Sequence, residues 1–178
     1  RCCKYLGIGN MPEYGIPSVM TADGPAGVRI APEVGICTTA FPCSTLLACT
    51  WNPDVLEAVG RAGGEELKEN NLALCSPLPS VFTEVLSAEN FEYYSEDPFV
   101  TGKLAGAMVR GIQSNNVGAT VKHFALNNKE TNRKNSDSRF QKELPEKSTG
   151  SIIPTKETFR RPERFRFRLS DYSGSLFV

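Results

Sequence analysis

The chain has 178 residues, of which 40% are hydrophobic, and its 20 basic and 20 acidic residues leave no net charge. This apolar content is enough for about one domain with a buried core. Without net positive charge, a dedicated nucleic-acid-binding protein is not expected. No apolar run approaches the roughly 20 residues of a membrane-spanning helix, and the first residues lack the apolar region of a signal peptide. We therefore expect a soluble chain that binds a neutral molecule, and neither nucleic acid nor a membrane.

The first expected element is a short buried strand at Val19–Met20, which ends at Asp23. Turn signals at Gly15 and at Gly24–Pro25 flank it. A carboxylate at the end of a strand is a candidate functional group, although a turn carboxylate that accepts hydrogen bonds from the following backbone is an equal alternative for Asp23.

A helix is predicted next, within the segment "TWNPDVLEAVGRAGGEELKENN". Asn52 is a typical N-cap, Pro53 suits the first helical position, and Asp54 lies in the first turn. One apolar stripe marks its buried face, formed by Val55, Leu56, Val59, Ala62 and Leu67. Three glycines cost helix propensity and indicate close packing against a neighbour, namely Gly60, Gly63 and Gly64.

A second helix is expected to follow Asp97-Pro98 and to run to about Gln113. Its apolar positions are Phe99, Val100, Leu104, Met108 and Ile112. A strand through Thr120–Val121 then delivers Lys122 and His123 at its end. Strands that alternate with helices predict an α/β fold with parallel strands.

The six cysteines follow no compact disulfide spacing, and no Cys-x-x-Cys pair occurs. We expect free, partly buried thiols, because cysteine behaves as a small hydrophobe. His123 is the only histidine, so neither a zinc site nor another metal or cofactor is expected.

The tail after Arg139 differs in composition from everything before it, with a basic, Phe-rich run "FRRPERFRFR" and no sustained periodicity. A disordered basic tail is one interpretation. An RNA-binding or membrane-binding patch is the other.

Three elements are candidates for chemistry: Asp23, the carboxylate pair Glu96-Asp97 beside Tyr93-Tyr94, and Lys122-His123. Charged donors and acceptors that converge at strand ends suit the hydroxyls of a sugar. Each element also has a simpler interpretation. A single histidine is often a hydrogen-bonded structural residue, and Glu96-Asp97 can be the start of a helix.

Four stretches carry a family resemblance: "DGPAGVR", "TAFPCSTLLACTWNPDVL", "NFEYYSEDP" and "VRGIQSNNVGATVKHFALNNKETNRKNSDSR". In order and spacing they resemble the amino-terminal half of the catalytic domain of glycoside hydrolase family 3, over residues 5–75 and 90–139. The resemblance implies a (β/α)₈ TIM-barrel-like domain whose strand ends carry the site. It also implies that Asp23 binds hydroxyls of the terminal sugar, and that Lys122 and His123 hold neighbouring hydroxyls.

One expected motif is missing. Between "NNLAL" and "NFEYYSEDP" the family carries a segment like "IHRSPLCGR", whose Arg is another sugar ligand, and Ser76 to Glu89 stand in its place. When the third base of each codon is read with the next two and silent bases are chosen freely, Val81 to Glu89 can encode Ile-His-Arg-Ser-Pro-Leu-Cys-Gly. The same offset over Arg139 to Thr149 permits most of the family's continuation. We hypothesise a displaced reading frame over residues 75–89 and from about 140 onward.

The resemblance predicts that residues 1–139 are an incomplete barrel domain, because a full barrel needs about 250 residues. Residues 140–178 are expected to be a non-native or disordered tail. Ser170-Asp171-Tyr172 imitates the family's nucleophile motif, but Asp171 lies too close to His123 and lacks a preceding apolar strand. We therefore expect both the nucleophile and the acid/base carboxylate to be absent.

The resemblance thus implies a fragment of a retaining β-glycosidase of the β-glucosidase type, which hydrolyses terminal non-reducing β-D-glucosyl residues in its intact form. The substrate would be a β-glucoside or an oligosaccharide. The alternative is a catalytically inactive remnant that binds sugar weakly. The sequence does not distinguish a glucoside from a xyloside or an N-acetylglucosaminide, and it does not indicate the oligomeric state.

Overall fold

The computed structural model describes residues 7–8, 11–15, 17–72, 74–79, 90–122 and 176–177. Within these residues the sheet has five strands in the order of the sequence. The strands are β1 (Gly7–Ile8), β2 (Val19–Asp23), β3 (Leu74–Pro79), β4 (Gly118–Lys122) and β5 (Leu176–Phe177). The three central strands, β2, β3 and β4, are parallel, whereas β1 and β5 pair antiparallel at the two edges.

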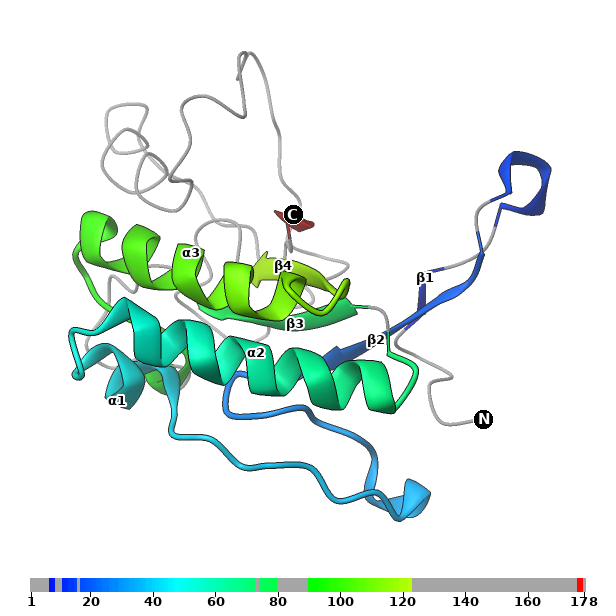
Figure 1. The fold of residues 1–178 in the computed structure, drawn as a ribbon, viewed down its shortest axis with the longest axis horizontal. Coiled ribbons are helices and arrows are strands. Elements are labelled where there is room, and N and C mark those ends of the chain that lie inside the picture. Colours follow the sequence, from blue (N-terminus) through cyan, green and yellow to red (C-terminus); the bar gives the residue numbers. More distant parts are fainter. Residues whose placement is uncertain are drawn as a thin grey trace, which may run out of the picture.

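Two long helices connect the parallel strands. Helix α2 (Pro53–Glu69) leads from β2 to β3, and α3 (Pro98–Gln113) leads from β3 to β4. Both helices lie side by side on one face of the sheet (Figure 1). The carboxyl ends of the parallel strands and the amino ends of the helices therefore meet at the same end of the molecule. The predicted α/β fold with parallel strands is confirmed.

Both helices begin where the sequence predicts. The side chain of Asn52 accepts a hydrogen bond from the Asp54 backbone N–H at 3.0 Å, and Pro53 occupies the first turn. In the same way, the Asp97 carboxylate accepts from the Val100 N–H at 2.9 Å at the start of α3. These caps satisfy backbone donors that have no partner within the helix.

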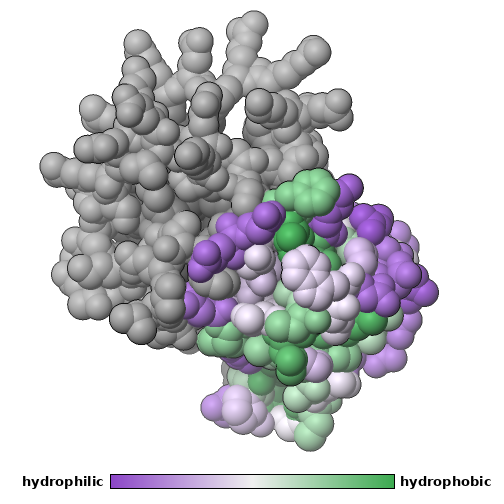
Figure 2. Space-filling view, turned by 90° about the vertical axis from the view of Figure 1, so that its left-hand side faces the viewer, coloured by the Kyte–Doolittle hydropathy of each residue, from purple (hydrophilic) through white to green (hydrophobic). Residues whose placement is uncertain are grey.

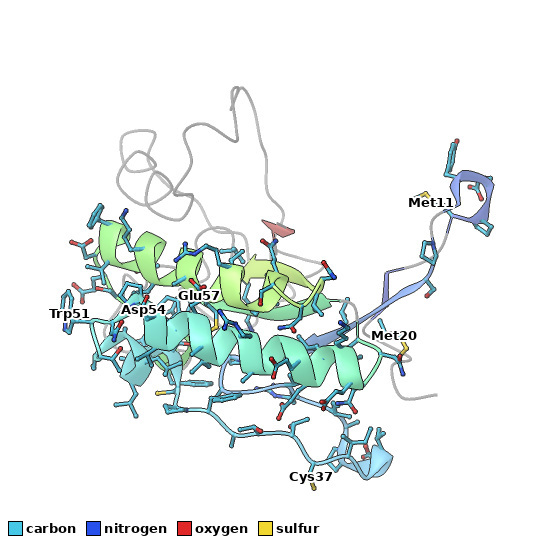
Figure 3. The ribbon with its side chains drawn as sticks, in the orientation of Figure 1. Met11, Met20, Cys37, Trp51, Asp54 and Glu57 are labelled. Carbon is cyan, nitrogen blue, oxygen red and sulfur yellow. The ribbon has the colours of Figure 1, made fainter. Side chains whose placement is uncertain are left out.

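Short helical turns fill the connections. These are η1 (Pro12–Tyr14), η2 (Pro32–Val34), α1 (Ser44–Ala48) and η3 (Asn90–Glu92). The segment with η2 extends away from the sheet, and Cys37 lies exposed near its tip (Figure 3). The later turns, α1 and η3, contact each other. Turn η3 follows β3 along the chain and contacts it.

Glycines allow α2 and α3 to approach closely. A Cβ atom on Gly60 would lie 2.5 Å from the Met108 carbonyl oxygen, and one on Gly64 would lie 2.8 Å from that of Ile112. On α3, a Cβ on Gly111 would overlap the carbonyl oxygen of Glu57. Close packing at Gly60 and Gly64 is thus confirmed. The prediction for Gly63 is wrong, because a Cβ there would meet nothing within 4 Å.

The core lies between the sheet and the two helices. Its fully buried members include Leu56, Leu67 and Ile112, in agreement with the predicted stripes. Val55 and Phe99 depart from them, since they are 37% and 71% exposed. Both residues lie near the amino ends of their helices, which extend past the sheet. Figure 2 shows this end of the molecule, where hydrophobic side chains lie beside hydrophilic ones.

Strand β3 was not predicted. Its sequence, "LCSPLP", contains two prolines, which cannot donate to a neighbouring strand and argue against a central strand. The register with β4 shifts between Cys75 and Leu78, on either side of Pro77. A central strand tolerates a proline at an irregularity of this kind. The regular hydrogen-bond ladder is already interrupted there, so the backbone N–H that proline lacks is not required.

The three cysteines whose side chains the structure describes are free: Cys43 is partly buried, while Cys37 and Cys49 are exposed. The expectation of partly buried thiols is therefore wrong for two of these three residues. The described helices include none that is both long and apolar enough to cross a bilayer.

Candidate functional site

The structure brings two of the predicted residues together. Asp23 ends β2 and Lys122 ends β4, so β3 separates them in the sheet. The Lys122 Nζ nevertheless lies 3.1 Å from Asp23 Oδ1, an ion pair that spans the carboxyl ends of the parallel strands. The Lys122 side chain is only 9% exposed and that of Asp23 is 30% exposed. The alternative interpretation, in which Asp23 is only a turn carboxylate, does not account for this ion pair with a residue far along the chain.

A third residue, Glu92, completes the pair and was not singled out from the sequence. Its Oε2 lies 3.0 Å from the Lys122 Nζ, and its side chain is 8% exposed. A buried carboxylate and a buried ammonium are tolerated together because each compensates the charge of the other. The only sequence signal was the position of Glu92 within "NFEYYSEDP".

A fourth charge, Arg29, lies at the solvent side. Its Nη1 is 3.4 Å from Asp23 Oδ2, and its backbone N–H donates to the Asp23 carbonyl oxygen at 2.7 Å. Glu92, Lys122, Asp23 and Arg29 thus alternate in sign from the interior to the surface, and we call these four residues the charge ladder. Its formal charges sum to zero, which favours their assembly at the edge of the core.

Local structure places each member of the charge ladder. Residues 24–28 reverse the chain between Asp23 and Arg29, and Gly27 has φ +115°, a conformation that residues with a side chain rarely adopt. The Ser44 hydroxyl on α1 approaches the Pro25 carbonyl oxygen at 3.4 Å. The hydroxyl of Thr45, also on α1, lies 2.9 Å from the Asn90 carbonyl and 2.8 Å from that of Tyr93. Helix α1 therefore fixes both the loop after Asp23 and the turn that carries Glu92.

Electrostatics keep Lys122 charged. Burial lowers the pKa of its ammonium group, but the nearby charges of Asp23 and Glu92, together with their hydrogen bonds, outweigh burial and raise the pKa above its ordinary value. The group is therefore a permanent donor at physiological pH. Asp23, by contrast, offers acceptor lone pairs beside it.

The carboxylate pair Glu96-Asp97 is not part of the charge ladder. Asp97 caps α3, as the simpler interpretation held, and both side chains lie in exposed residues. Their neighbours Tyr93 and Tyr94 are 4% and 3% exposed and belong to the core. Burial raises the pKa of the Tyr94 hydroxyl above its ordinary range. This part of "NFEYYSEDP" therefore serves packing and helix capping, while Glu92 pairs with Lys122.

Two predicted residues, His123 and Asp171, lie outside the described residues, as does most of the segment assigned to a displaced frame. Strand β3 covers its first residues, up to Pro79, and β5 covers Leu176–Phe177 of the tail. Among the described side chains, no group of three or more His, Cys, Asp or Glu residues could hold a metal ion.

Known proteins match this chain closely. Over 135 residues it is 68% identical to "Beta-glucosidase A" of Butyrivibrio fibrisolvens, an alignment that covers 75% of this chain and 16% of the relative. It is 39% identical over 136 residues to an "Exo-alpha-(1->6)-L-arabinopyranosidase" of Bifidobacterium longum, which covers 71% of this chain and 18% of that protein. The chain spans less than a fifth of either relative.

The fold matches solved structures as well. Beta-glucosidase 3B from Thermotoga neapolitana, in complex with glucose, superposes with a TM-score of 0.72 at 40% sequence identity, over 80% of this chain and 21% of that one. The family model described as "Glycosyl hydrolase family 3 N terminal domain" matches residues 10–149. The chain therefore belongs to glycosyl hydrolase family 3, of which it contains part of the N-terminal domain.

Proposed function

We propose that this chain is part of a retaining β-glucosidase, and that its charge ladder binds the non-reducing terminal sugar. The observation that carries the proposal is the Asp23–Lys122 ion pair, which joins the carboxyl ends of the parallel strands β2 and β4 across β3. The relatives named β-glucosidase support the activity, and the neighbour solved with glucose supports the class of ligand.

The sheet supports a further structural proposal. Strands β2, β3 and β4 with helices α2 and α3 form consecutive β/α units. We infer that they are part of a (β/α)₈ barrel that the remaining length of the protein completes, since a barrel needs about 250 residues. Sites of such barrels lie at the carboxyl ends of the strands, where the charge ladder lies.

The chemistry of the charge ladder suits binding. A sugar hydroxyl both donates and accepts, so a carboxylate beside an ammonium can engage two neighbouring hydroxyls of one ring. Asp23 and Glu92 each direct an oxygen at Lys122. This favours roles in binding and positioning over proton transfer or nucleophilic attack. Double displacement needs two further carboxylates about 5 Å apart, a nucleophile and an acid/base, and we propose that they belong to later parts of the protein.

The assay is the hydrolysis of p-nitrophenyl β-D-glucopyranoside by the 178-residue chain and by the full-length protein. We expect no turnover by the chain alone. The full-length protein should turn over, and Asp23→Asn should lower its kcat/KM about 10- to 100-fold, the effect of losing a charge-assisted hydrogen bond. Turnover by the short chain would refute the fragment proposal. A full-length protein that cleaves no aryl glycoside would leave the inactive remnant as the better interpretation.

The sugar itself is a separate question within this proposal. The arabinopyranosidase relative resembles this region about as strongly as several β-glucosidases do, at 39% identity against 39% to 43%. Similarity over these residues therefore does not select the substrate. The assay should include the aryl β-xyloside, N-acetyl-β-glucosaminide and α-L-arabinopyranoside, and we propose the glucoside as the preferred one.

We also propose that the reading frame is displaced over residues 75–89 and after about residue 140. The support is the Ile-His-Arg-Ser-Pro-Leu-Cys-Gly that the displaced frame permits at Val81 to Glu89. Resequencing the coding DNA across codons 74–90 and 138–178 should show one or two bases gained or lost at each place. The in-frame protein would then regain an arginine ligand for the sugar. DNA that agrees with the protein as written would refute this proposal.

A further inference from the structure

Glu92 is the most buried charge of the charge ladder and lies behind Lys122, away from the solvent side. Its side chain is 8% exposed, against 30% for Asp23 and 65% for Arg29. The turn η3 that carries it is held by the Thr45 hydroxyl on α1, which lies 2.9 Å from the Asn90 carbonyl at the start of the turn and 2.8 Å from the Tyr93 carbonyl just after it. Among the described residues, the cation that this carboxylate contacts is Lys122, at 3.0 Å.

We infer that Glu92 is a positioning residue, which orients the Lys122 ammonium so that one N–H remains directed at a sugar hydroxyl beside Asp23. The inference rests on the proposed function, because it assigns a role to Glu92 in the sugar binding proposed for Asp23 and Lys122.

The first argument is the number of donors on Lys122. An ammonium has three N–H donors. Glu92 Oε2 lies 3.0 Å from Nζ and Asp23 Oδ1 lies 3.1 Å from it, so among the described residues two carboxylates contact the ammonium, fewer than its three donors. Two anchors on different elements fix the rotation of the ammonium. With Asp23 alone, the flexible four-carbon stem would allow several orientations, and ordering them would reduce the affinity for the sugar.

The second argument is the charge around Asp23. Its carboxylate lies between two cations, Lys122 at Oδ1 and Arg29 at Oδ2. Glu92 compensates the charge of Lys122 from the interior side. Asp23 is then not the only counter-charge for both cations, and its remaining lone pairs stay available to accept from hydroxyl groups.

A purely structural role is the competing explanation, in which Glu92 merely prevents Lys122 from being a buried unpaired charge. The two roles predict different sugar affinity at neutral pH: a purely structural role leaves Ki unchanged in a variant that folds, while the positioning role raises it, and the pH dependence then reports the loss of the Glu92 charge. The charged groups that face Lys122 among the described residues are Asp23 from β2 and Glu92 from η3, with Arg29 behind Asp23. Removing the charge of Glu92 leaves burial opposed by Asp23 alone, so the pKa of Lys122 should fall. Sugar binding that needs the ammonium would then be lost at lower pH than in the wild type.

The test uses the full-length protein with the variants Glu92→Gln and Glu66→Gln. Glu66 is a matched control, because its carboxylate is also partly buried and accepts a backbone N–H, from Thr39 at 2.8 Å, yet within the described part of the chain it forms no ion pair with Lys122. Inhibition by glucose is measured as Ki from about pH 6 to 11, well below the melting temperature of each variant. Lys122 is also titrated directly by NMR of its labelled side chain.

For Glu92→Gln we expect Ki for glucose to rise about tenfold at pH 7. We also expect the alkaline limb, the pH range above which glucose binding is lost, to lie lower by about one pH unit or more. The Lys122 titration should move with it. Glu66→Gln should leave both unchanged. An unchanged Ki and alkaline limb in folded Glu92→Gln would overturn the positioning role, while the proposed function would stand. If the wild type itself does not bind glucose, the proposed function fails, and this outcome is recognised without any variant.

Discussion

Lys122→Met is expected to lower the free energy of unfolding of the chain by about 3–5 kcal/mol at neutral pH. The substitution keeps the length of the side chain but removes the cation that compensates Glu92, which is 8% exposed. A buried carboxylate without a counter-charge is costly because it loses its hydration and gains nothing in return. Urea unfolding followed by far-UV circular dichroism measures the effect. A loss below about 1 kcal/mol, the size typical of a surface pair, would show that water reaches the charge ladder freely.

The double variant Lys122→Met with Glu92→Gln is the control for this explanation. It removes the unpaired charge, so much of the lost stability should return, because a buried ion pair is often replaceable by neutral groups at little cost. The coupling energy between the two sites follows from the double-mutant cycle. Additive losses would contradict the direct interaction of Lys122 with Glu92. The double variant should still fail to bind sugar, since stability and binding depend on different properties of Lys122.

Gly111→Ala is expected to destabilise the chain by about 1–3 kcal/mol, the usual cost of overpacking. Its Cβ would overlap the carbonyl oxygen of Glu57 and lie 2.8 Å from the Arg61 backbone nitrogen. Both atoms belong to the backbone of α2, which cannot rotate away as a side chain could. The helices would therefore have to separate, although alanine is the better helix former.

Gly63→Ala is the matched control, with the same change at a helical glycine of α2. A Cβ at Gly63 meets nothing within 4 Å and would enter a small apolar hollow that Gly60 and Met108 also line. We expect a gain of about 0.5–1 kcal/mol from helix propensity. If both variants change the stability equally in urea unfolding, then helix propensity and not the approach of the two helices decides the result.

Local signals allowed much of the fold to be predicted. The N-caps Asn52 and Asp97 each lie beside a proline and start a helix where expected, because capping depends on residues two or three positions apart. The same locality explains the failure at β3. Two prolines obscure the strand, and it forms because β2 and β4 supply hydrogen-bond partners from distant parts of the sequence.

The residues of the candidate site also fall into two groups, those that local sequence patterns indicate and those that only the packing brings together. The sequence by itself singled out Asp23 and Lys122 as candidates, because a polar residue at the end of an apolar strand is a local pattern, and its motifs identified the family. Only the tertiary structure joined them to Glu92, which is 30 positions from Lys122, and showed that Glu96 and Asp97 stay outside the site. Burial and the direction of a side chain decide which of several neighbouring carboxylates faces a buried lysine. Both depend on how α1, η3 and the sheet pack together, and no spacing along the chain encodes that arrangement directly.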